Sequence, residues 1–266
     1  MSVSVKRVFI VDVSDQRLKT VKKLLQDEGR SVFDFVQDQK YSDNPQIQYV
    51  YIFPPYVPID YKLASMLSYG SVAFALGCFD QQARQTLKDN NITAFYYNDD
   101  EILVMKNAYL TAEGTLAAII NNTQKSLKSQ KILILGYGRV GKALTKLLGN
   151  IGADASVATS DVYELAHAAV YVDKTYTLKD FTDGLSNYDV IINTVPKMIL
   201  KGDKLQHIRK DAFVIDLASL PGGVDLDEAN KLGLNVLHYL GVPAKTAAIT
   251  AGQYLYESVK RALEKV

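Results

Sequence analysis

The glycine-rich segment at residues 136–141, Gly-Tyr-Gly-Arg-Val-Gly, is the stretch of this sequence whose residue types and spacing most clearly predict chemistry. It has the G-x-G-x-x-G spacing of dinucleotide-binding loops. Gly136 permits a tight turn, Gly138 lets the backbone approach a pyrophosphate, and Gly141 lets the following helix pack closely on the strand. The start of that helix offers free N–H groups and the positive end of its dipole to phosphate. Tyr137, Arg139 and Val140 complete the predicted cofactor loop.

The residues on either side of this loop have the context that it requires. Residues 131–135 are rich in branched aliphatic side chains and predict a buried parallel strand. After the loop, apolar residues recur on one face of a helix: Val140, Ala143, Leu144, Leu147, Leu148 and Ile151. A strand, a glycine turn and an amphipathic helix in this order predict a dinucleotide site, rather than a glycine turn that serves packing alone.

The end of the next predicted strand bears on the choice of cofactor. An NAD site usually has an acid about 20 residues past the glycine loop, where it binds the ribose 2′-hydroxyl. This chain has Thr159 and Ser160 there, which favours NADP, although no arginine at this strand end is present to bind a 2′-phosphate. Asp161 lies slightly beyond the usual position of the ribose-binding acid and is better interpreted as a helix N-cap.

Two further strand ends are predicted to face the nicotinamide half of the cofactor. Their small side chains and proline-fixed turns suit a stacked ring, although ordinary strand–loop junctions would look similar. These residues are Thr194, Val195 and Pro196 at one end, and Leu217, Ala218 and Ser219 at the other. Of the three histidines, only His238 ends a predicted strand near this site; His167 and His207 are interpreted as structural. No Ser/His/Asp order, Walker pattern or metal-ligand spacing occurs, so no metal is expected.

Composition excludes several classes of function. The chain has 266 residues and a formal net charge of +1, and no basic run indicates nucleic acid or an anionic membrane. Cys78 is the only cysteine, which excludes intrachain disulfides and a thiolate metal cluster. No apolar segment is long enough to span a bilayer, and the first residues lack the order of a signal peptide. We therefore expect a cytoplasmic protein.

The alternation of strands and helices predicts an α/β fold with two doubly wound, Rossmann-like parallel-sheet domains and an interdomain cleft. Residues 1–128 are predicted to form a flavodoxin- or Rossmann-like domain on the substrate side. Its strands are expected at 6–13, 31–36, 47–53, 71–77 and 92–97. The first strand–helix turn, residues 11–15, has two acids and no glycine, so it should not hold a phosphate well. Residues 99–128 resemble a connector, with a helix from Thr111.

Residues 129–266 are predicted to form the NAD(P)-binding domain. Its strands are expected at 131–135, 153–159, 169–172, 188–195, 212–217 and 234–238, in the dinucleotide-binding order. The last helix, about 247–265, has apolar residues at spacings of three and four and is expected to pack on the first domain.

Five segments of the second domain, in order, closely resemble the family of the dipicolinate synthase A subunit: GYGRVG, INTVPKMIL, VIDLASLPGGVD, LGVP and TAGQ. The first domain agrees more loosely, through residues 111–115. The resemblance implies an NAD(P)-dependent oxidoreductase, distantly similar to D-2-hydroxyacid dehydrogenases, that oxidises dihydrodipicolinate to dipicolinate with hydride transfer to NADP. It also implies a small dicarboxylate substrate, self-association, for example as a homodimer, and a flavoprotein-like second subunit.

The chain departs from the family pattern at positions that bear on the substrate. Thr159, Leu220 and Ile249 stand where basic residues are common in the family, and Lys197 or Lys245 are the candidate replacements. Glu113, as the base, and Gln253 are the candidate substrate-site residues, on segments expected to flank the interdomain cleft. Glu113 would otherwise be a first-turn helix carboxylate beside Thr111, and Gln253 a polar residue at the surface or the domain seam.

Two alternative functions remain open from the sequence. The first is a D-2-hydroxyacid dehydrogenase-like enzyme, for which His238 would have to be the acid. The second is a non-catalytic dinucleotide sensor or assembly subunit that has lost its substrate-binding cations.

Overall fold

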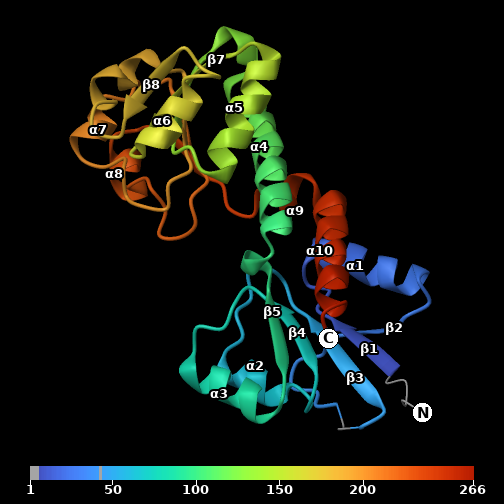
Figure 1. Ribbon diagram of the computed structural model, residues 1–266. Coiled ribbons are helices and arrows are strands. Elements are labelled where there is room, and N and C mark those ends of the chain that lie inside the picture. Colours follow the sequence, from blue (N-terminus) through green and yellow to red (C-terminus); the bar gives the residue numbers. More distant parts are fainter. Residues whose placement is uncertain (1–5, 42–43) are drawn as a thin grey trace. The chain divides into compact units, whose positions relative to one another are not determined.

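The computed structural model describes residues 6–41 and 44–266, which form two compact units (Figure 1). Met1–Asn107 and Ala247–Val266 make up the first unit, and Ala108–Thr246 the second. Each unit contains one parallel sheet with helices, so the predicted fold class is confirmed. The division lies inside helix α4 (Glu101–Thr123), which is one continuous helix, and thus well before residue 128, where the sequence places the domain boundary.

The described part of the first unit contains a five-stranded sheet in the order β2-β1-β3-β4-β5. Its core lies on both faces of the sheet, with α2 and α3 contributing to one side and α1 and α10 to the other. The strands are β1 (Lys6–Val11), β2 (Ser31–Asp34), β3 (Ile47–Ile52), β4 (Val72–Ala75) and β5 (Thr93–Tyr96). The helices are α1 (Gln16–Asp27), α2 (Tyr61–Met66), α3 (Gln81–Asp89) and α10 (Ala248–Leu263).

Helix α10 packs closely on α1 within this unit. A Cβ atom on Gly252 would lie 2.5 Å from the carbonyl oxygen of Arg17, so only glycine allows this approach. At the start of α1, Asp15 caps the helix and pairs with Arg17 at 2.7 Å, and both side chains are buried. The second acid of this turn, Asp12, accepts a hydrogen bond from the N–H of Ser14. Both acids therefore bind groups of their own turn.

The second unit, whose backbone is described throughout, has six parallel strands in the order β11-β10-β9-β6-β7-β8. This is the dinucleotide-binding order expected from the sequence, with the switch point between β6 and β9. The strands are β6 (Lys131–Leu135), β7 (Asp154–Thr159), β8 (Lys174–Thr177), β9 (Val190–Asn193), β10 (Phe213–Asp216) and β11 (Asn235–His238). The helices are α5 (Arg139–Ile151), α6 (Val162–Ala168), α7 (Asp203–Gln206), α8 (Leu226–Lys231) and α9 (Val242–Thr246), besides the later part of α4.

Two of the expected elements are wrong. Residues 169–172 follow α6 in a turn instead of a strand, and the third strand of this sheet along the chain is β8. The apolar run resembles a strand, but Val170 is 77% exposed, and Val172 packs only partly against the core. Helix α4 begins at Glu101, ten residues before Thr111, and Asp100 accepts hydrogen bonds from the N–H groups of its first turn.

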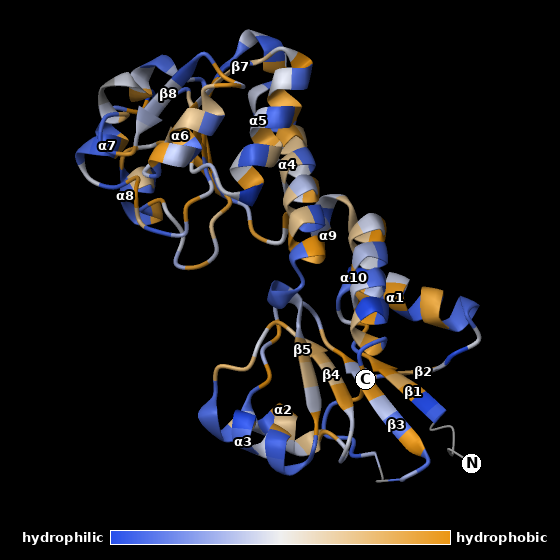
Figure 2. Ribbon diagram, in the orientation of Figure 1, coloured by the Kyte–Doolittle hydropathy of each residue, from blue (hydrophilic) through white to orange (hydrophobic). Residues whose placement is uncertain are grey.

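The long α4 lacks a single apolar face because its two ends contribute to different cores. Leu103 packs in a core of the first unit, whereas Ala112, Leu116 and Ile119 pack in a core of the second. In Figure 2, α1 and α5 show hydrophobic and hydrophilic residues in alternating stretches, as amphipathic helices do.

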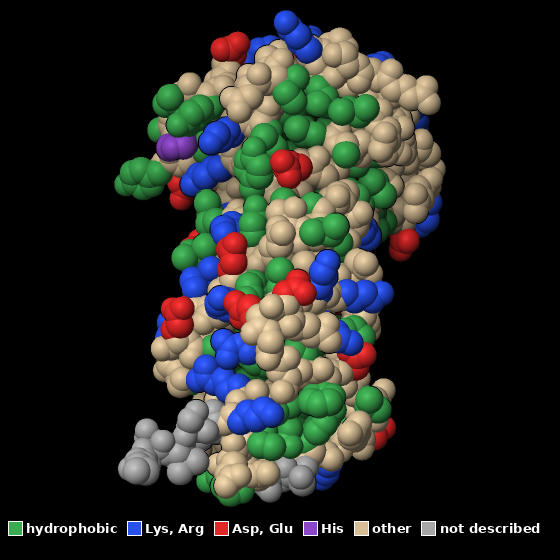
Figure 3. All heavy atoms as spheres, turned by 90° about the vertical axis from the view of Figure 1, so that its right-hand side faces the viewer, with side chains coloured by type: hydrophobic (Ala, Val, Ile, Leu, Met, Phe, Trp, Pro, Cys, Tyr) green, Lys and Arg blue, Asp and Glu red, His purple; other side chains and the backbone are tan. Residues whose placement is uncertain are grey.

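On the face shown in Figure 3, Lys and Arg side chains lie among Asp and Glu side chains. The described residues contain no helix that is both long and apolar enough to cross a membrane.

Candidate functional site

Two of the three loop glycines are required by the packing of the second unit. Gly136 has a φ of +94°, and an added Cβ atom would lie 2.4 Å from Oγ1 of Thr194. At Gly141, an added Cβ atom would lie 2.3 Å from the carbonyl oxygen of Gly136. The turn after β6 and the start of α5 therefore approach each other, and the end of β9, more closely than any side chain would permit.

Gly138 differs from its two neighbours. It has an ordinary φ of −70°, and an added Cβ atom would meet nothing within 4 Å. It is the N-cap residue of α5, and no side chain among the residues that the structure describes caps this helix. The positive end of the α5 dipole therefore lies beside the open space at Gly138, where a ligand can reach the backbone. Arg139 is exposed and Val140 packs partly against the core.

Tyr137 lies within the predicted cofactor loop, but its side chain points into the protein. Only 2% of it is exposed, and its hydroxyl lies 3.1 Å from Nδ1 of His167. Burial, followed by the nearby Tyr171 and Glu164, raises the pKa of this phenol above its usual value. Only the backbone of Tyr137 is therefore placed to contribute to a dinucleotide site.

The end of β7 has a carboxylate that the sequence alone did not reveal. Thr159 is 4% exposed, and its hydroxyl donates a hydrogen bond of 2.6 Å to Oε2 of Glu164. Asp161 accepts hydrogen bonds from the N–H groups of Tyr163 and Glu164, at 2.8 and 2.9 Å, so its interpretation as an N-cap is confirmed. Ser160 is exposed.

The ends of β9 and β10 are joined by a buried polar pair. Asn193 and Asp216 are paired in the sheet register, both are fully buried, and Nδ2 of Asn193 donates to Oδ1 of Asp216 at 2.7 Å. The carboxylate also accepts hydrogen bonds from the N–H groups of Ala218, Gly223 and Val224, at 3.1, 2.8 and 3.2 Å. The pair thus fixes the two loops predicted to face the nicotinamide, residues 194–196 and 217–219.

This pair is not among the site residues predicted from the sequence, although the sequence contains a signal for it. Asn193 and Asp216 each end an otherwise apolar strand, and polar residues at such positions need partners when they are buried.

His238 supports the same loop. It is paired with Asp216 in the register of β10 and β11, and its Nε2 lies 2.9 Å from the carbonyl oxygen of Ala218. This contact occupies the ring nitrogen with the backbone and favours a structural role over that of a catalytic acid.

The structure brings the cofactor-loop residues together with the end of β9, since Thr194 donates a hydrogen bond of 2.9 Å to the carbonyl oxygen of Leu135.

The two candidate substrate residues belong to different units. Glu113 is exposed on α4 in the second unit, and Gln253 is exposed on α10 in the first. Glu113 lies in the middle of α4, so its interpretation as a first-turn carboxylate is wrong. The interdomain cleft and the roles of both residues stay predictions.

Two of the three positions that depart from the family pattern lie at the surface. Leu220 is 75% exposed and Ile249 is 69% exposed, and neither can bind a carboxylate. Of the possible replacements, Lys197 is exposed beyond β9, and the ammonium of Lys245 lies 5.1 Å from the centre of the Tyr239 ring.

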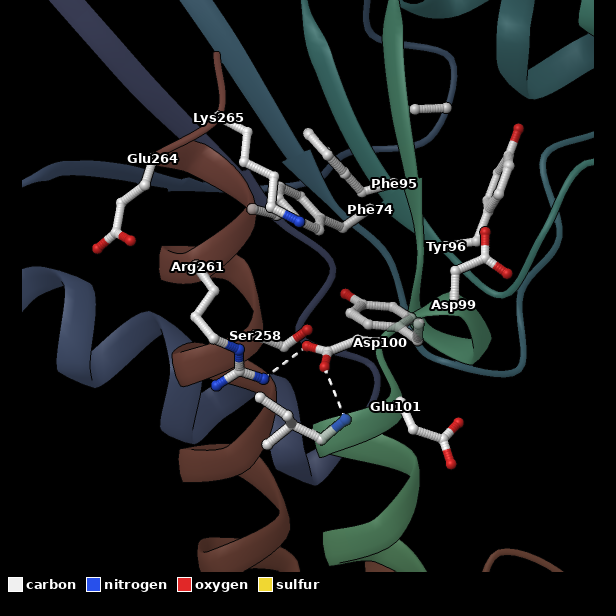
Figure 4. Close-up of a pocket in the computed structure, with 14 residues that line it drawn as sticks. Phe74, Phe95, Tyr96, Asp99, Asp100, Glu101, Ser258, Arg261, Glu264 and Lys265 are labelled. Atoms are coloured by element: carbon white, nitrogen blue, oxygen red, sulfur yellow. Dashed lines mark hydrogen bonds and ion pairs between the residues drawn. The ribbon is translucent and has the colours of Figure 1, made fainter.

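The first unit has a separate pocket of about 500 Å³ between β4, β5 and the end of α10 (Figure 4). Arg261 binds the carboxylate of Asp100 there at 2.6 Å. Although burial opposes ionisation, hydrogen bonds from Ser258 and Arg261 outweigh it and lower the pKa of Asp100. These charges neutralise each other, and the residues lining the pocket include none of the predicted site residues. Within the described residues, no group of three or more His, Cys, Asp or Glu is placed to hold a metal ion.

Comparison with known proteins gives matches to a dehydrogenase NAD-binding family and to the A subunit of dipicolinate synthase. Residues 105–220 match the family described as D-isomer specific 2-hydroxyacid dehydrogenase, NAD binding domain. The A subunit of dipicolinate synthase from Bacillus subtilis is 29% identical over 170 residues, which are 64% of this chain and 57% of that protein. The aligned part thus spans little more than half of this relative's length.

Solved structures agree in fold. The A subunit of dipicolinate synthase from Bacillus halodurans superposes with a TM-score of 0.82 at 23% identity, covering 98% of both chains. The corresponding dipicolinate synthase structure from Bacillus subtilis gives 0.81 at 20% identity, covering 98% of this chain and 96% of that one. An NAD-complexed D-isomer specific 2-hydroxyacid dehydrogenase from Lactobacillus delbrueckii is more distant, with a TM-score of 0.57 at 15% identity over 97% and 96% of the two chains. The resemblance predicted from the sequence motifs is confirmed.

Proposed function

Because this chain is an NAD-binding, dehydrogenase-type protein related to the A subunit of dipicolinate synthase, we propose that it oxidises a small dicarboxylate such as dihydrodipicolinate. The observation that carries the dinucleotide-binding part of the proposal is the contrast within the glycine loop. Gly136 and Gly141 are required by packing, whereas Gly138 faces open space at an uncapped helix start. Packing gives no reason for a glycine at 138, but close approach of a pyrophosphate does.

The residues of the second unit fit a nicotinamide dinucleotide. The backbone at residues 137–140 would bind the pyrophosphate, Thr159 and Ser160 would lie at the adenosine ribose, and residues 194–196 and 217–219 at the nicotinamide. When bound, the nicotinamide ring of NADP or NAD accepts a hydride. The Asn193–Asp216 pair holds both nicotinamide-side loops in place before any ligand arrives, which lowers the cost of ordering them.

The residues at the substrate have a limited chemical task in this reaction. Loss of a hydride to the nicotinamide and of a proton to a base converts a dihydropyridine dicarboxylate into an aromatic pyridine. The protein would therefore have to align the C–H bond, bind two carboxylates and accept that proton. We assign the proton to Glu113 and hydrogen bonding of the substrate to Gln253. Lys197 and Lys245 are the cations proposed to bind carboxylate. Self-association, for example as a homodimer, and a flavoprotein-like second subunit belong to the same proposal.

Two other functions remain as alternatives. A D-2-hydroxyacid dehydrogenase-like activity is favoured by the match of residues 105–220, but His238 is bound to the carbonyl oxygen of Ala218. A non-catalytic sensor or assembly subunit is favoured by the apolar Leu220 and Ile249.

A turnover assay with the purified full-length chain separates the three functions. Reduction of NADP or NAD with dihydrodipicolinate supports the proposed function, whereas turnover of D-2-hydroxy acids alone supports the first alternative. Tight dinucleotide binding without turnover of either substrate, with or without a second subunit, supports the sensor and refutes the proposed enzyme.

A further inference from the structure

The end of β7 contains a carboxylate in the region where a dinucleotide site selects between its two cofactors. We propose that Glu164 takes the role of the missing ribose-binding acid and gives this site a preference for NAD over NADP. The inference rests on the proposed dinucleotide site, and it reverses the cofactor preference that the sequence favoured.

Thr159 lies at the end of β7, next to the glycine loop. Strands β6 and β7 are paired up to Leu135 and Ala158, and the N–H of Gly136 donates to the carbonyl oxygen of Ala158 at 2.7 Å. Thr159 is therefore the next residue along β7 beyond the contact with the glycine loop. In a sheet of this order, the ribose next to the adenine lies at this strand end.

The side chain of Thr159 is fixed, and it fixes Glu164 in turn. Because Thr159 is almost fully buried, its hydroxyl has a defined direction, and it donates to Oε2 of Glu164 at 2.6 Å. From the other side, the N–H of Glu164 donates to the Asp161 carboxylate at 2.9 Å, which anchors the first turn of α6. The Glu164 carboxylate is thus held at the end of β7, although it comes from a residue five positions later.

A carboxylate at this point acts on the two cofactors in opposite ways. Its two oxygens can accept about four hydrogen bonds, so the bond from Thr159 leaves room for a ribose 2′-hydroxyl. The 2′-phosphate of NADP carries negative charge, and the negative charge of the carboxylate would repel it. The charge of Glu164 also reaches the glycine loop, because it is one of the causes, after burial and Tyr171, that raise the pKa of Tyr137.

Two cations belong to the pyrophosphate side of the site. Lys142 lies on α5, and its ammonium is 5.7 Å from the centre of the Tyr137 ring. Arg139 is in the first turn of the same helix. Both follow the glycine loop and not β7, so they favour the phosphates common to NAD and NADP.

Titration of the full-length protein with NADH and NADPH, followed by nicotinamide fluorescence, tests the inference. We expect the wild type to bind NADH about tenfold more tightly than NADPH, and Glu164→Gln to lose most of this preference. Thr159→Val removes only the hydroxyl that positions Glu164, so it should lower the preference in part.

Asp161→Asn is the matched control. It removes one negative charge from the same loop, but asparagine keeps the N-cap, so the NADH to NADPH ratio should stay within about twofold of wild type. Thermal unfolding of each variant shows whether it is folded.

Three outcomes would overturn the inference alone: tighter NADPH binding by the wild type, an unchanged ratio in Glu164→Gln, or an equal change in Asp161→Asn. Failure to bind either dinucleotide would overturn the proposed function, and this inference with it.

Discussion

The three loop glycines predict two different mutational effects, and the sharper prediction concerns Gly138. Replacing it with valine places a side chain where an added Cβ atom meets nothing within 4 Å, at a φ of −70° that any residue adopts. The folded state should tolerate the change to within about 1 kcal/mol, since only the weaker N-cap propensity opposes it. A bound pyrophosphate would need the same space. We expect dinucleotide affinity to fall at least ~100-fold, which is about 2.7 kcal/mol of binding free energy.

The neighbouring glycines should behave in the opposite way. Alanine at Gly136 would bring Cβ to 2.4 Å from Oγ1 of Thr194, and alanine at Gly141 would bring it to 2.3 Å from a backbone oxygen. We expect each of these variants to lose roughly 2–4 kcal/mol of unfolding free energy, because the backbone must shift. Gly149→Ala is the matched control on the exposed side of α5, where nothing lies within 4 Å. It should keep its affinity and gain up to about 1 kcal/mol.

Two measurements on the same proteins check this pattern. Urea unfolding gives the free energy of unfolding, and titration with NADH and NADPH gives the affinities. A stable Gly138→Val variant that binds a dinucleotide as the wild type does would refute the assignment of the cofactor loop. A loss of stability in this variant equal to that of Gly141→Ala would refute the distinction between the glycines.

Three further predictions concern other parts of the chain. Asp15→Asn should cost about 3 kcal/mol of unfolding free energy at neutral pH, because Arg17 stays buried without its partner. Burial opposes ionisation of Asp15, but Arg17 outweighs it and lowers the pKa below 3.8; the ionised pair therefore stabilises the fold above this value. The difference between wild type and variant in urea unfolding should thus shrink as the pH falls through the folded pKa, and a constant difference would contradict the assignment. Asp216→Asn should cost about 2–3 kcal/mol and weaken dinucleotide binding, because one of the N–H groups of the 217–223 loop loses its acceptor; unfolding and titration measure the two effects. Glu113→Gln should lower turnover about 100-fold with NAD(P) affinity unchanged, and a wild-type rate would exclude it as the base.

Much of the second unit could be predicted from the sequence because its signals are local. A five-residue apolar strand, the glycine spacing and an amphipathic helix each specify their own structure, and the alternation of strands and helices then limits the sheet order. The N-cap at Asp161 is local in the same way. Residues 169–172 misled the prediction because a short apolar run has the same composition in a strand and in an exposed turn.

The missed features depend on contacts between distant residues. Helix α4 has no single apolar face because its two ends pack in separate cores, and so no regular period marks its start. The role proposed for Glu164 depends on a side chain that reaches back from the next helix to Thr159. The burial of Tyr137 and the pairing of Asn193 with Asp216 appear only when the sheet is assembled.

The place of α10 in the first unit has a consequence for synthesis on the ribosome. Its residues Leu255, Val259 and Leu263 complete a core whose strands and remaining helices come before residue 108. The whole second unit, 108–246, is therefore translated between the two parts of the first. The second unit can fold as soon as its own residues emerge, whereas the face of α1 that receives α10 stays uncovered until the final helix is made. We therefore expect the first unit, although its translation begins earlier, to reach its final packing after the second unit.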